Sequence, residues 1–386
     1  MMRLAPLIFR NALRNRRRTL LTVLSIATSL SLLGVMLALY QSFFLDEGTR
    51  EESLRLITRH RVSVTSVMPI SYIDEIRKIP GVREAMVMQW FGGNFRDPGD
   101  PRNLFPRFSV EPDRLFTIFP EYSVPEDQKR AFISERTACM IGRPVAERLG
   151  LKLGDRIHLV GDIWPVTLEL NLRAIYDSDR DRENLLFNHE YLRQSVPRGM
   201  RDAISFFAIL AESPEAVPRV AEAVDARFRN STAPTLTETA RAFELSMLSY
   251  MGNVKLILFA IGAAVSFTLL LVSANTVSMS VRERVPEVGI LKTLGFSSSS
   301  IRALFLGESA AIALLGGLLG LAFTAVLCAI LRHMPLVFAD LSRVTLTPGA
   351  IAITLGLAAL IGAASAWAPA WSAARLPIVT AVRFKE

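Results

Sequence analysis

Residues 256–281 read LILFAIGAAVSFTLLLVSANTVSMSV and contain no charged side chain. A helix needs roughly 20 apolar residues to cross a bilayer core that is about 30 Å thick. Thr19 to Phe44 and Thr345 to Arg375 are likewise uncharged between their ends. Leu304 to Leu331 contains a single charge, Glu308. Because buried helices of soluble proteins are usually shorter and keep a polar face, the sequence predicts an α-helical membrane protein with four transmembrane helices, at residues 19–44, 254–280, 303–331 and 346–370.

The segment between the first two spans has the composition of a water-soluble domain. From Phe44 to Tyr250 it holds 28 basic and 31 acidic residues, and therefore a net charge of −3. Alternating and helical spacings of apolar residues predict strands at 61–67, 82–89, 156–160, 166–176 and 203–211. They predict helices at 71–79, 215–228 and 239–250, another ending at Gly150, and a helical stalk at 45–60. We therefore expect a mixed α/β extracytoplasmic domain over residues 45–250, with long loops at 92–125, where Pro and Gly are concentrated.

The net charge of +8 arises from segments that flank the predicted spans. Six arginines and no acid precede the first span, and the loop at 281–302 and the tail at 371–386 are also net basic. Short cytoplasmic loops are enriched in Lys and Arg, so these three segments are predicted to be cytoplasmic. Residues 1–18 are expected to form an amphipathic helix on the membrane surface, and the short loop at 332–345 to lie outside. The basic charge thus marks orientation and contact with membrane lipid, and we expect no nucleic-acid partner.

A search for catalytic, cofactor or metal motifs finds none. No Gly is followed by Lys, which excludes a phosphate-binding loop of the Walker A type. The four histidines are isolated and lack the spacing of zinc ligands. No Ser lies in a G-x-S-x-G context. We therefore expect that the chain is not itself an enzyme and binds no cofactor or metal.

Three short segments carry a family resemblance. They are ALRNRRRTLLT at 12–22, VRERVPEVGILKTLG at 281–295 and PAWSAARLPIVTAVR at 369–383. In this combination and order they closely resemble permease subunits of the MacB/FtsX-like ABC transporter superfamily. The resemblance implies a type VII ABC permease of the bacterial inner membrane, in which two copies, or two related permeases, sit on cytoplasmic ATPase subunits that bind ATP and Mg²⁺. It also implies that ATP-driven motion is transmitted across the membrane to the outer domain, a process called mechanotransmission.

The loop at 281–302 is the expected contact with the ATPase. A helix there would place Val285, Val288 and Leu291 on one face and would end at Gly295 in a left-handed conformation. Its pattern alone fits equally well a helix that rests on lipid and one that enters a groove of a partner protein. The resemblance favours the second, a coupling helix. The expected coupling residues are Glu283, Arg284, Pro286, Glu287, Gly289, Leu291, Lys292 and Gly295.

Polar and small residues inside the spans provide further candidates. Gly316 and Gly320 form a small-xxx-small pattern that favours close helix packing, and Asn275 is expected to hydrogen-bond to a neighbouring helix. Glu308 lies about one turn inside the third span, where we expect it to reach the interface or to pair with a base such as Arg302 or Lys292. A role for Glu308 in signal transfer is the less favoured hypothesis.

The expected function is that of a permease subunit in a MacB-like export or extrusion system, a branch that works with a periplasmic adaptor protein. One alternative is a lipoprotein-releasing permease of the Lol type. Another is an FtsX-like regulator of a cell-wall hydrolase, which moves no substrate. The size of the 45–250 domain favours the first two. A receptor or scaffold without an ATPase is a further class, which the loop at 281–295 argues against.

Overall fold

The computed structural model describes residues 16–45, 49, 51–178, 182–250, 252–332, 341 and 344–377. The chain divides into two compact units, which are described separately. One unit contains the long helices, and the other contains the domain between the first two of them. The expected surface helix at 1–18 is described only from residue 16, and most of the 332–345 loop and of the tail lies outside the described residues.

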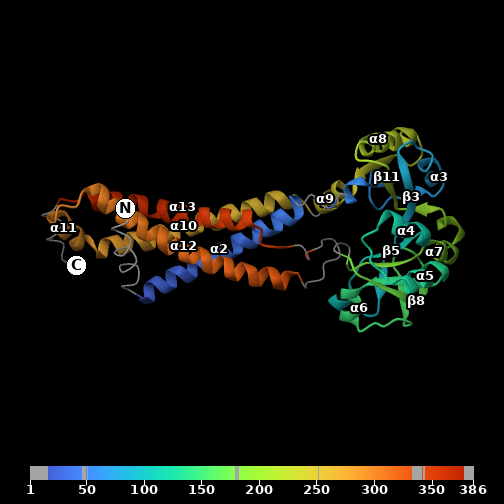
Figure 1. Cartoon of the computed structure of the whole chain (residues 1–386), viewed down its shortest axis with the longest axis horizontal. Helices are drawn as coiled ribbons and strands as arrows, with labels where there is room; N and C mark the ends of the chain where they lie inside the picture. The colour runs from blue at the N-terminus through green and yellow to red at the C-terminus, as the bar shows by residue number, and fades with distance from the viewer. Residues whose placement is uncertain are drawn as a thin grey trace. The chain divides into compact units, whose positions relative to one another are not determined.

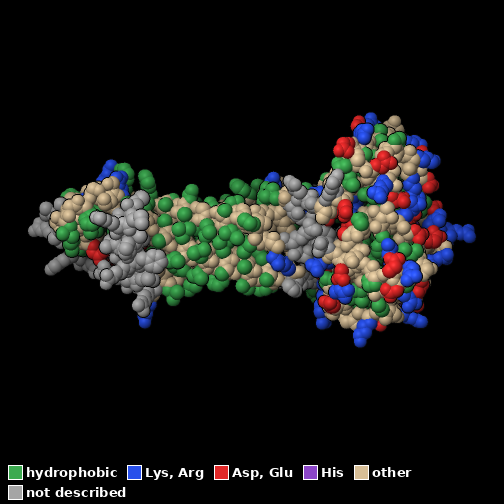
Figure 2. Space-filling view, in the orientation of Figure 1, with side chains coloured by type: hydrophobic (Ala, Val, Ile, Leu, Met, Phe, Trp, Pro, Cys, Tyr) green, Lys and Arg blue, Asp and Glu red, His purple; other side chains and the backbone are tan. Residues whose placement is uncertain are grey.

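Four long apolar helices make up the first unit (Figure 1). They are α2 (Arg16–Phe44), α10 (Val254–Glu283), α12 (Ser298–Leu331) and α13 (Pro348–Arg375). Each is long and apolar enough to cross a membrane, which confirms the predicted four-span fold. Hydrophobic side chains cover the middle of this unit, whereas charged side chains cover the surface of the other (Figure 2).

The core of the helix unit runs along α12, which packs against both α2 and α13. Residues from all four helices meet in one apolar cluster, which contains Ile26, Leu30, Leu33, Leu269, Ala313, Ala358 and Ile361. Ser297 and Thr347 cap the starts of α12 and α13, and their hydroxyls accept hydrogen bonds from Ser300 N–H and Ala350 N–H. Such caps satisfy backbone donors that a helix start leaves without partners.

The second unit is built on a ten-stranded mixed sheet with the order β12-β1-β11-β3-β5-β9-β6-β8-β7-β4. Its strands are β1 (Arg55–His60), β3 (Val82–Trp90), β4 (Gly93–Phe95), β5 (Arg107–Val110), β6 (Ala138–Gly142), β7 (Arg156–Gly161), β8 (Thr167–Tyr176), β9 (Leu185–Asn188), β11 (Phe206–Ala211) and β12 (Thr235–Thr239). β5 pairs in parallel with β9, and β6 with β8, and the other pairs are antiparallel. A second, two-stranded sheet joins β2 (Met68–Pro69) to β10 (Ala203–Ile204).

Helices cover the sheet and complete three apolar clusters. α3 (Tyr72–Ile76) and α8 (Ala216–Phe228) contribute to the first, and α4 (Pro112–Ile118), α5 (Glu126–Ser134) and the start of α9 (Ala240–Tyr250) to the second. α6 (Arg143–Leu149) and α7 (His189–Ser195) contribute to the third. Short 3-10 turns occupy Glu52–Leu54, Pro101–Asn103 and Arg198–Met200. This arrangement confirms the predicted mixed α/β domain.

Two segments of this domain differ from the sequence-based prediction. Residues 61–67 form a loop in which Val62 is 76% exposed, and the strand lies earlier, at β1, where a helical stalk was expected. β1 pairs with β11 and β12 and is buried along almost its whole length, so it lacks the alternation of a half-buried strand. The predicted long loops at 92–125 are also wrong, because this segment contains β4, β5 and α4.

Candidate functional site

A short helix, α11 (Val285–Thr293), occupies the loop between α10 and α12. Gly295 has a φ of +91°, the left-handed conformation that the sequence predicts. Phe296 N–H donates to Leu291 O at 3.0 Å and Gly295 N–H to Lys292 O at 3.1 Å. These two bonds form a Schellman motif, in which a glycine reverses the chain at no steric cost. The loop is shorter than the predicted 281–302 segment, because α10 continues to Glu283 and α12 begins at Ser298. We call the end of the helix unit that carries α11 the loop end.

The predicted apolar face of α11 is turned toward the helices of the same chain. Val288 is 1% exposed and lies in a cluster with residues of α12 and α13, and Leu291 packs against the same cluster. The remaining members of this cluster are Val281, Ile301, Phe305, Ala370, Ala373 and Ala374. This face is therefore not available to a partner protein. The exposed apolar side chains belong instead to Ile290, Leu294 and Phe296, at 56%, 70% and 40%.

Arg284, which precedes α11, forms a buried ion pair with Glu308 of α12. Arg284 Nη1 lies 2.6 Å from Glu308 Oε2, and the two side chains are 9% and 10% exposed. The expected pairing of Glu308 with a base is confirmed, but the base is Arg284 rather than Arg302 or Lys292. Lys292 Nζ instead donates to Leu376 O at 2.6 Å, and the guanidinium carbon of Arg302 lies 4.5 Å from the ring centroid of Trp371.

A cavity of about 200 Å³ lies beside this ion pair, within the helix unit. Its walls come from all four long helices and from Arg284, and the lining residues include Thr22, Ser273 and Ser309, whose side chains carry hydroxyl groups. Glu283 and Glu287 also line it. Polar and ionisable groups inside membrane spans are costly and mark functional sites by default. The pair and its cavity are therefore the strongest candidate site that the described part of the helix unit contains.

The other predicted coupling residues lie on or beside α11 and differ in how far they are buried. Gly289 is buried, Pro286 and Glu287 are half-buried, and Glu283 and Gly295 are exposed. Glu287 also lies near Arg284, with 4.0 Å between Arg284 Nε and Glu287 Oε2. Arg284, Glu287 and Glu308 thus form one charged group, whereas Gly295 belongs to the separate turn that ends α11.

The small residues predicted for helix packing lie between α12 and α2. A Cβ atom added at Gly316 would stand 2.5 Å from Ile26 Cγ2, and one at Gly320 would stand 2.8 Å from Ala27 O. Real Cβ contacts are not this short, so the backbones approach where only glycine fits. Asn275, by contrast, is exposed on α10, and no hydrogen bond from it to a neighbouring helix is seen among the residues that the structure describes.

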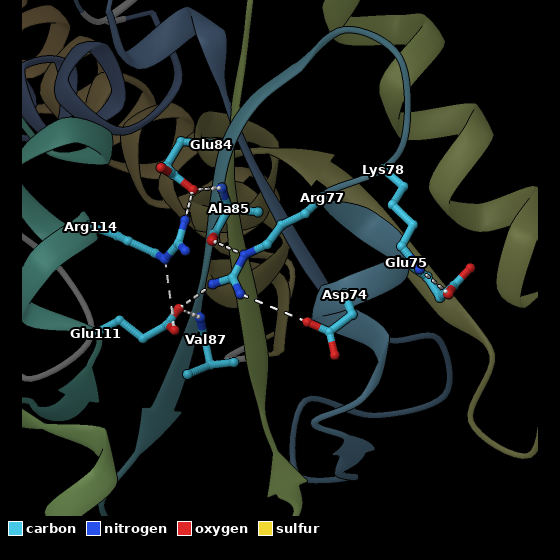
Figure 3. Close-up of polar contacts among 9 residues, drawn as sticks. All are labelled: Asp74, Glu75, Arg77, Lys78, Glu84, Ala85, Val87, Glu111 and Arg114. Atoms are coloured by element: carbon cyan, nitrogen blue, oxygen red, sulfur yellow. Dashed lines mark hydrogen bonds and ion pairs between the residues drawn. The ribbon is translucent and has the colours of Figure 1, made fainter.

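The outer domain contains a polar network that the sequence did not indicate (Figure 3). Arg77, which directly follows α3, donates to Glu111 at 2.7 Å and to Ala85 O at 3.0 Å. Glu111 also accepts from Val87 N–H at 3.1 Å, and Arg114 of α4 bonds to Glu84 of β3. The partners are about 30 residues apart in the sequence, so no periodic pattern joins them. The network joins α4 and the end of α3 to β3.

Models of known protein families match both the membrane helices and the domain between the first two of them. A model of the MacB-like periplasmic core domain matches residues 19–227, and a model of the FtsX-like permease C-terminal region matches residues 257–378. The chain belongs to the MacB/FtsX-like ABC transporter permease family. Permease subunits of this family are generally not catalytic, and the four apolar helices make this member a multi-pass membrane protein.

Individual relatives carry related descriptions. An uncharacterized ABC transporter permease of Methanocaldococcus jannaschii is 22% identical over 341 residues, which cover 84% of each chain. The macrolide export ATP-binding/permease protein MacB of Bdellovibrio bacteriovorus is 31% identical over 115 residues, 29% of this chain and 16% of that protein. Among solved structures, the periplasmic region of MacB from Actinobacillus actinomycetemcomitans covers 53% of this MacB/FtsX-like permease and 97% of that chain, with a TM-score of 0.39 and 6% identity.

Proposed function

We propose that this chain is the transmembrane subunit of an ABC export or extrusion system, and that it transmits ATPase-driven motion from α11 to the outer domain. The observation that carries this proposal is the buried contact between Arg284 and Glu308. Three relatives with matching segments are named ATP-binding/permease proteins, so they join both activities in one chain. By analogy, a separate ATPase would bind ATP and Mg²⁺ for this permease, which would itself bind neither.

The surface that we assign to the ATPase comprises Ile290, Leu294 and Phe296, here called the docking patch. All three side chains are exposed and apolar, and they lie on α11 and the turn that follows it. Grouped exposed apolar side chains at a polar end of a protein favour a protein–protein contact. Leu291 and Val288 would then hold α11 to its own bundle, and the docking patch would hold it to the partner.

Movement of α11 would reach the membrane helices through three kinds of contact. Val288 and Leu291 pack against α12 and α13, and Lys292 bonds to the backbone just after α13. Arg284 is joined to Glu308 on α12. Separating a buried ion pair leaves an uncompensated charge, which costs about 3–5 kcal/mol. This cost resists separation of α11 from α12, so a force on α11 would displace the helices rather than α11 alone.

The proposed orientation follows from charge. The arginines before the apolar span of α2 and the basic residues at both ends of α11 favour a cytoplasmic location for the termini and for α11. The outer domain would then lie on the other side of a bacterial inner membrane. Two copies, or this permease and a related one, would assemble with the ATPase, and a periplasmic adaptor would complete an export system.

Native copurification tests this function. We expect an ABC ATPase subunit to copurify with the wild-type chain and to be lost from an I290D/L294D variant. Val62→Asp is the matched control, because it places the same charge at an exposed apolar position of the outer domain. A wild-type chain that copurifies no ATPase would contradict the proposal. A copurified periplasmic adaptor would indicate export, whereas a bound lipoprotein or cell-wall hydrolase would indicate one of the two alternative functions.

A further inference from the structure

Two arginines lie against one indole ring at the loop end of the helix unit. The guanidinium carbon of Arg302, near the start of α12, is 4.5 Å from the ring centroid of Trp371. That of Arg375, the last residue of α13, is 4.8 Å from the same centroid. Ser298 Oγ donates to Ala374 O at 3.0 Å, which holds the start of α12 beside the end of α13. The two guanidinium carbons can therefore be no farther apart than the sum of these two distances, a span that one phosphate headgroup could reach across.

No acidic side chain within the described ranges forms an ion pair with Arg302 or Arg375. Arg284, at the same end of the unit, is by contrast paired with Glu308. Two like charges held this close repel each other. An anion between them would remove the repulsion, and the planar fork of arginine matches the oxygens of a phosphate group.

The surroundings of this pair match the headgroup level of a membrane. Arg302 directly precedes the predicted span of α12, whose single charge is Glu308, and Arg375 directly follows the uncharged part of α13. Trp367 lies one turn before Trp371, stacks with it at 6.0 Å between centroids, and is 61% exposed. Tryptophan is enriched at the boundary between headgroups and acyl chains. A lipid therefore fits better than a soluble anion, because the exposed indole would contact its acyl chain.

We propose that Arg302, Trp371 and Arg375 form a binding site for the phosphate headgroup of an anionic phospholipid, with one acyl chain along Trp367. Arg302 and Arg375 donate hydrogen bonds to the phosphate oxygens, and Trp371 orients both guanidinium groups. Lys292, which bonds to Leu376 O next to Arg375, adds a third positive charge nearby. The site requires only that the bundle spans a bilayer, so it is independent of the proposed ATPase coupling.

Lipid competition measured by native mass spectrometry tests the site. The full chain is extracted from nanodiscs that contain equal amounts of phosphatidylglycerol and phosphatidylcholine, and the ratio of the two retained lipids is measured. We expect wild type to retain phosphatidylglycerol preferentially, and each of Arg302→Gln and Arg375→Gln to lower the ratio about fivefold. Arg282→Gln is the matched control, because it removes one exposed arginine at the end of α10 and leaves the indole site intact.

Three results would overturn the proposal. The first is the absence of a preference for phosphatidylglycerol in the wild-type chain, a result that does not depend on any variant. The second is an R302Q/R375Q variant that keeps both the wild-type lipid ratio and every protein that copurifies with the wild type. The third is an R302Q/R375Q variant that keeps the lipid ratio but loses a copurified protein, which would assign the arginines to a protein contact. An R302K/R375K variant keeps both charges, and its retention of the preference would show that a fall in R302Q/R375Q does not arise from misfolding.

Discussion

Arg284 and Glu308 are joined by a 2.6 Å contact between Nη1 and Oε2, although 24 residues separate them in the sequence. Arg284 lies where α10 ends and α11 begins, and Glu308 lies on α12. The pair therefore links the helix that we assign to the ATPase contact with a membrane span. The cavity beside it leaves space in which the pair could change its arrangement during a cycle.

Removing the charge of Glu308 should weaken the effect of the permease on ATP hydrolysis more than the binding of the ATPase to the permease. Glu308→Gln removes the closer of the two carboxylates beside Arg284 and leaves Glu287, whose Oε2 lies 4.0 Å from Arg284 Nε. We therefore expect a less stable loop end and a reduced effect of the permease on ATP hydrolysis. The docking patch is unchanged, so the ATPase should still copurify. The measurement is ATPase activity with and without the permease in proteoliposomes. An E308Q variant with wild-type stimulation would contradict a role for the pair.

Glycine at position 316 should be required for packing of α12 against α2. Gly316→Ala places a Cβ 2.5 Å from Ile26 Cγ2 and should destabilise the bundle by about 1–3 kcal/mol. Gly356→Ala on α13 is the matched control, because no atom lies within 4 Å of the added Cβ. Thermal unfolding in detergent should show a lower midpoint for G316A only. Equal midpoints for the two variants would show that α12 and α2 do not approach this closely.

Stability of the outer domain should fall as the pH drops from about 6.5 to 4. Burial lowers the pKa of His189 from 6.5 to about 4, and Ser109 Oγ lies 2.9 Å from its Nδ1. Between these two pH values the unfolded chain binds a proton that the folded chain does not. The free energy of unfolding therefore falls by up to about 3 kcal/mol as the pH drops from 6.5 to 4, and this group causes no change above pH 6.5.

The measurement is the unfolding midpoint as a function of pH. His189→Gln should flatten the profile in this window. Identical profiles for wild type and H189Q would rule out His189 as the titrating group.

The Arg77–Glu111 contact should contribute more to stability than the surface pairs near it. Glu111→Ala removes the acceptor of both Arg77 and Val87 N–H, which should cost about 1–3 kcal/mol. Glu75→Ala is the matched control: Glu75 bonds to the exposed side chains of Lys78 and Arg227, and exposed ion pairs contribute little. Unfolding midpoints of the two variants would be compared, and a larger loss in E75A would contradict this account.

The membrane part of the fold was predictable because each span carries its own signal of length and hydropathy. Pro286 and Gly295 likewise mark the start and the end of α11 locally. The partner of Glu308 was not predictable, because the turn between α10 and α11 rather than a periodic spacing brings Arg284 to it.

β1 was missed for a related reason. Its polar residues Arg55 and Arg59 are buried, and their charges are paired with Glu121 and Glu238 from distant segments. The strand therefore has no polar face. Residues 61–67 alternate more regularly between apolar and polar side chains, so the strand was predicted there instead.

The most direct test of the proposed transmission is a distance measurement on the outer domain during the ATPase cycle. A spin label at position 62, which is exposed, would report the separation of the two copies in the proposed assembly. The native Cys139 is buried, and burial raises the pKa of its thiol, so it should not be labelled. We predict that trapping ATP changes the distance distribution in the wild-type background and that Glu308→Gln abolishes the change while ATP is still bound. A distribution that does not respond to ATP, or that responds equally in E308Q, would contradict the proposal that motion passes from α11 through the Arg284–Glu308 pair to the outer domain.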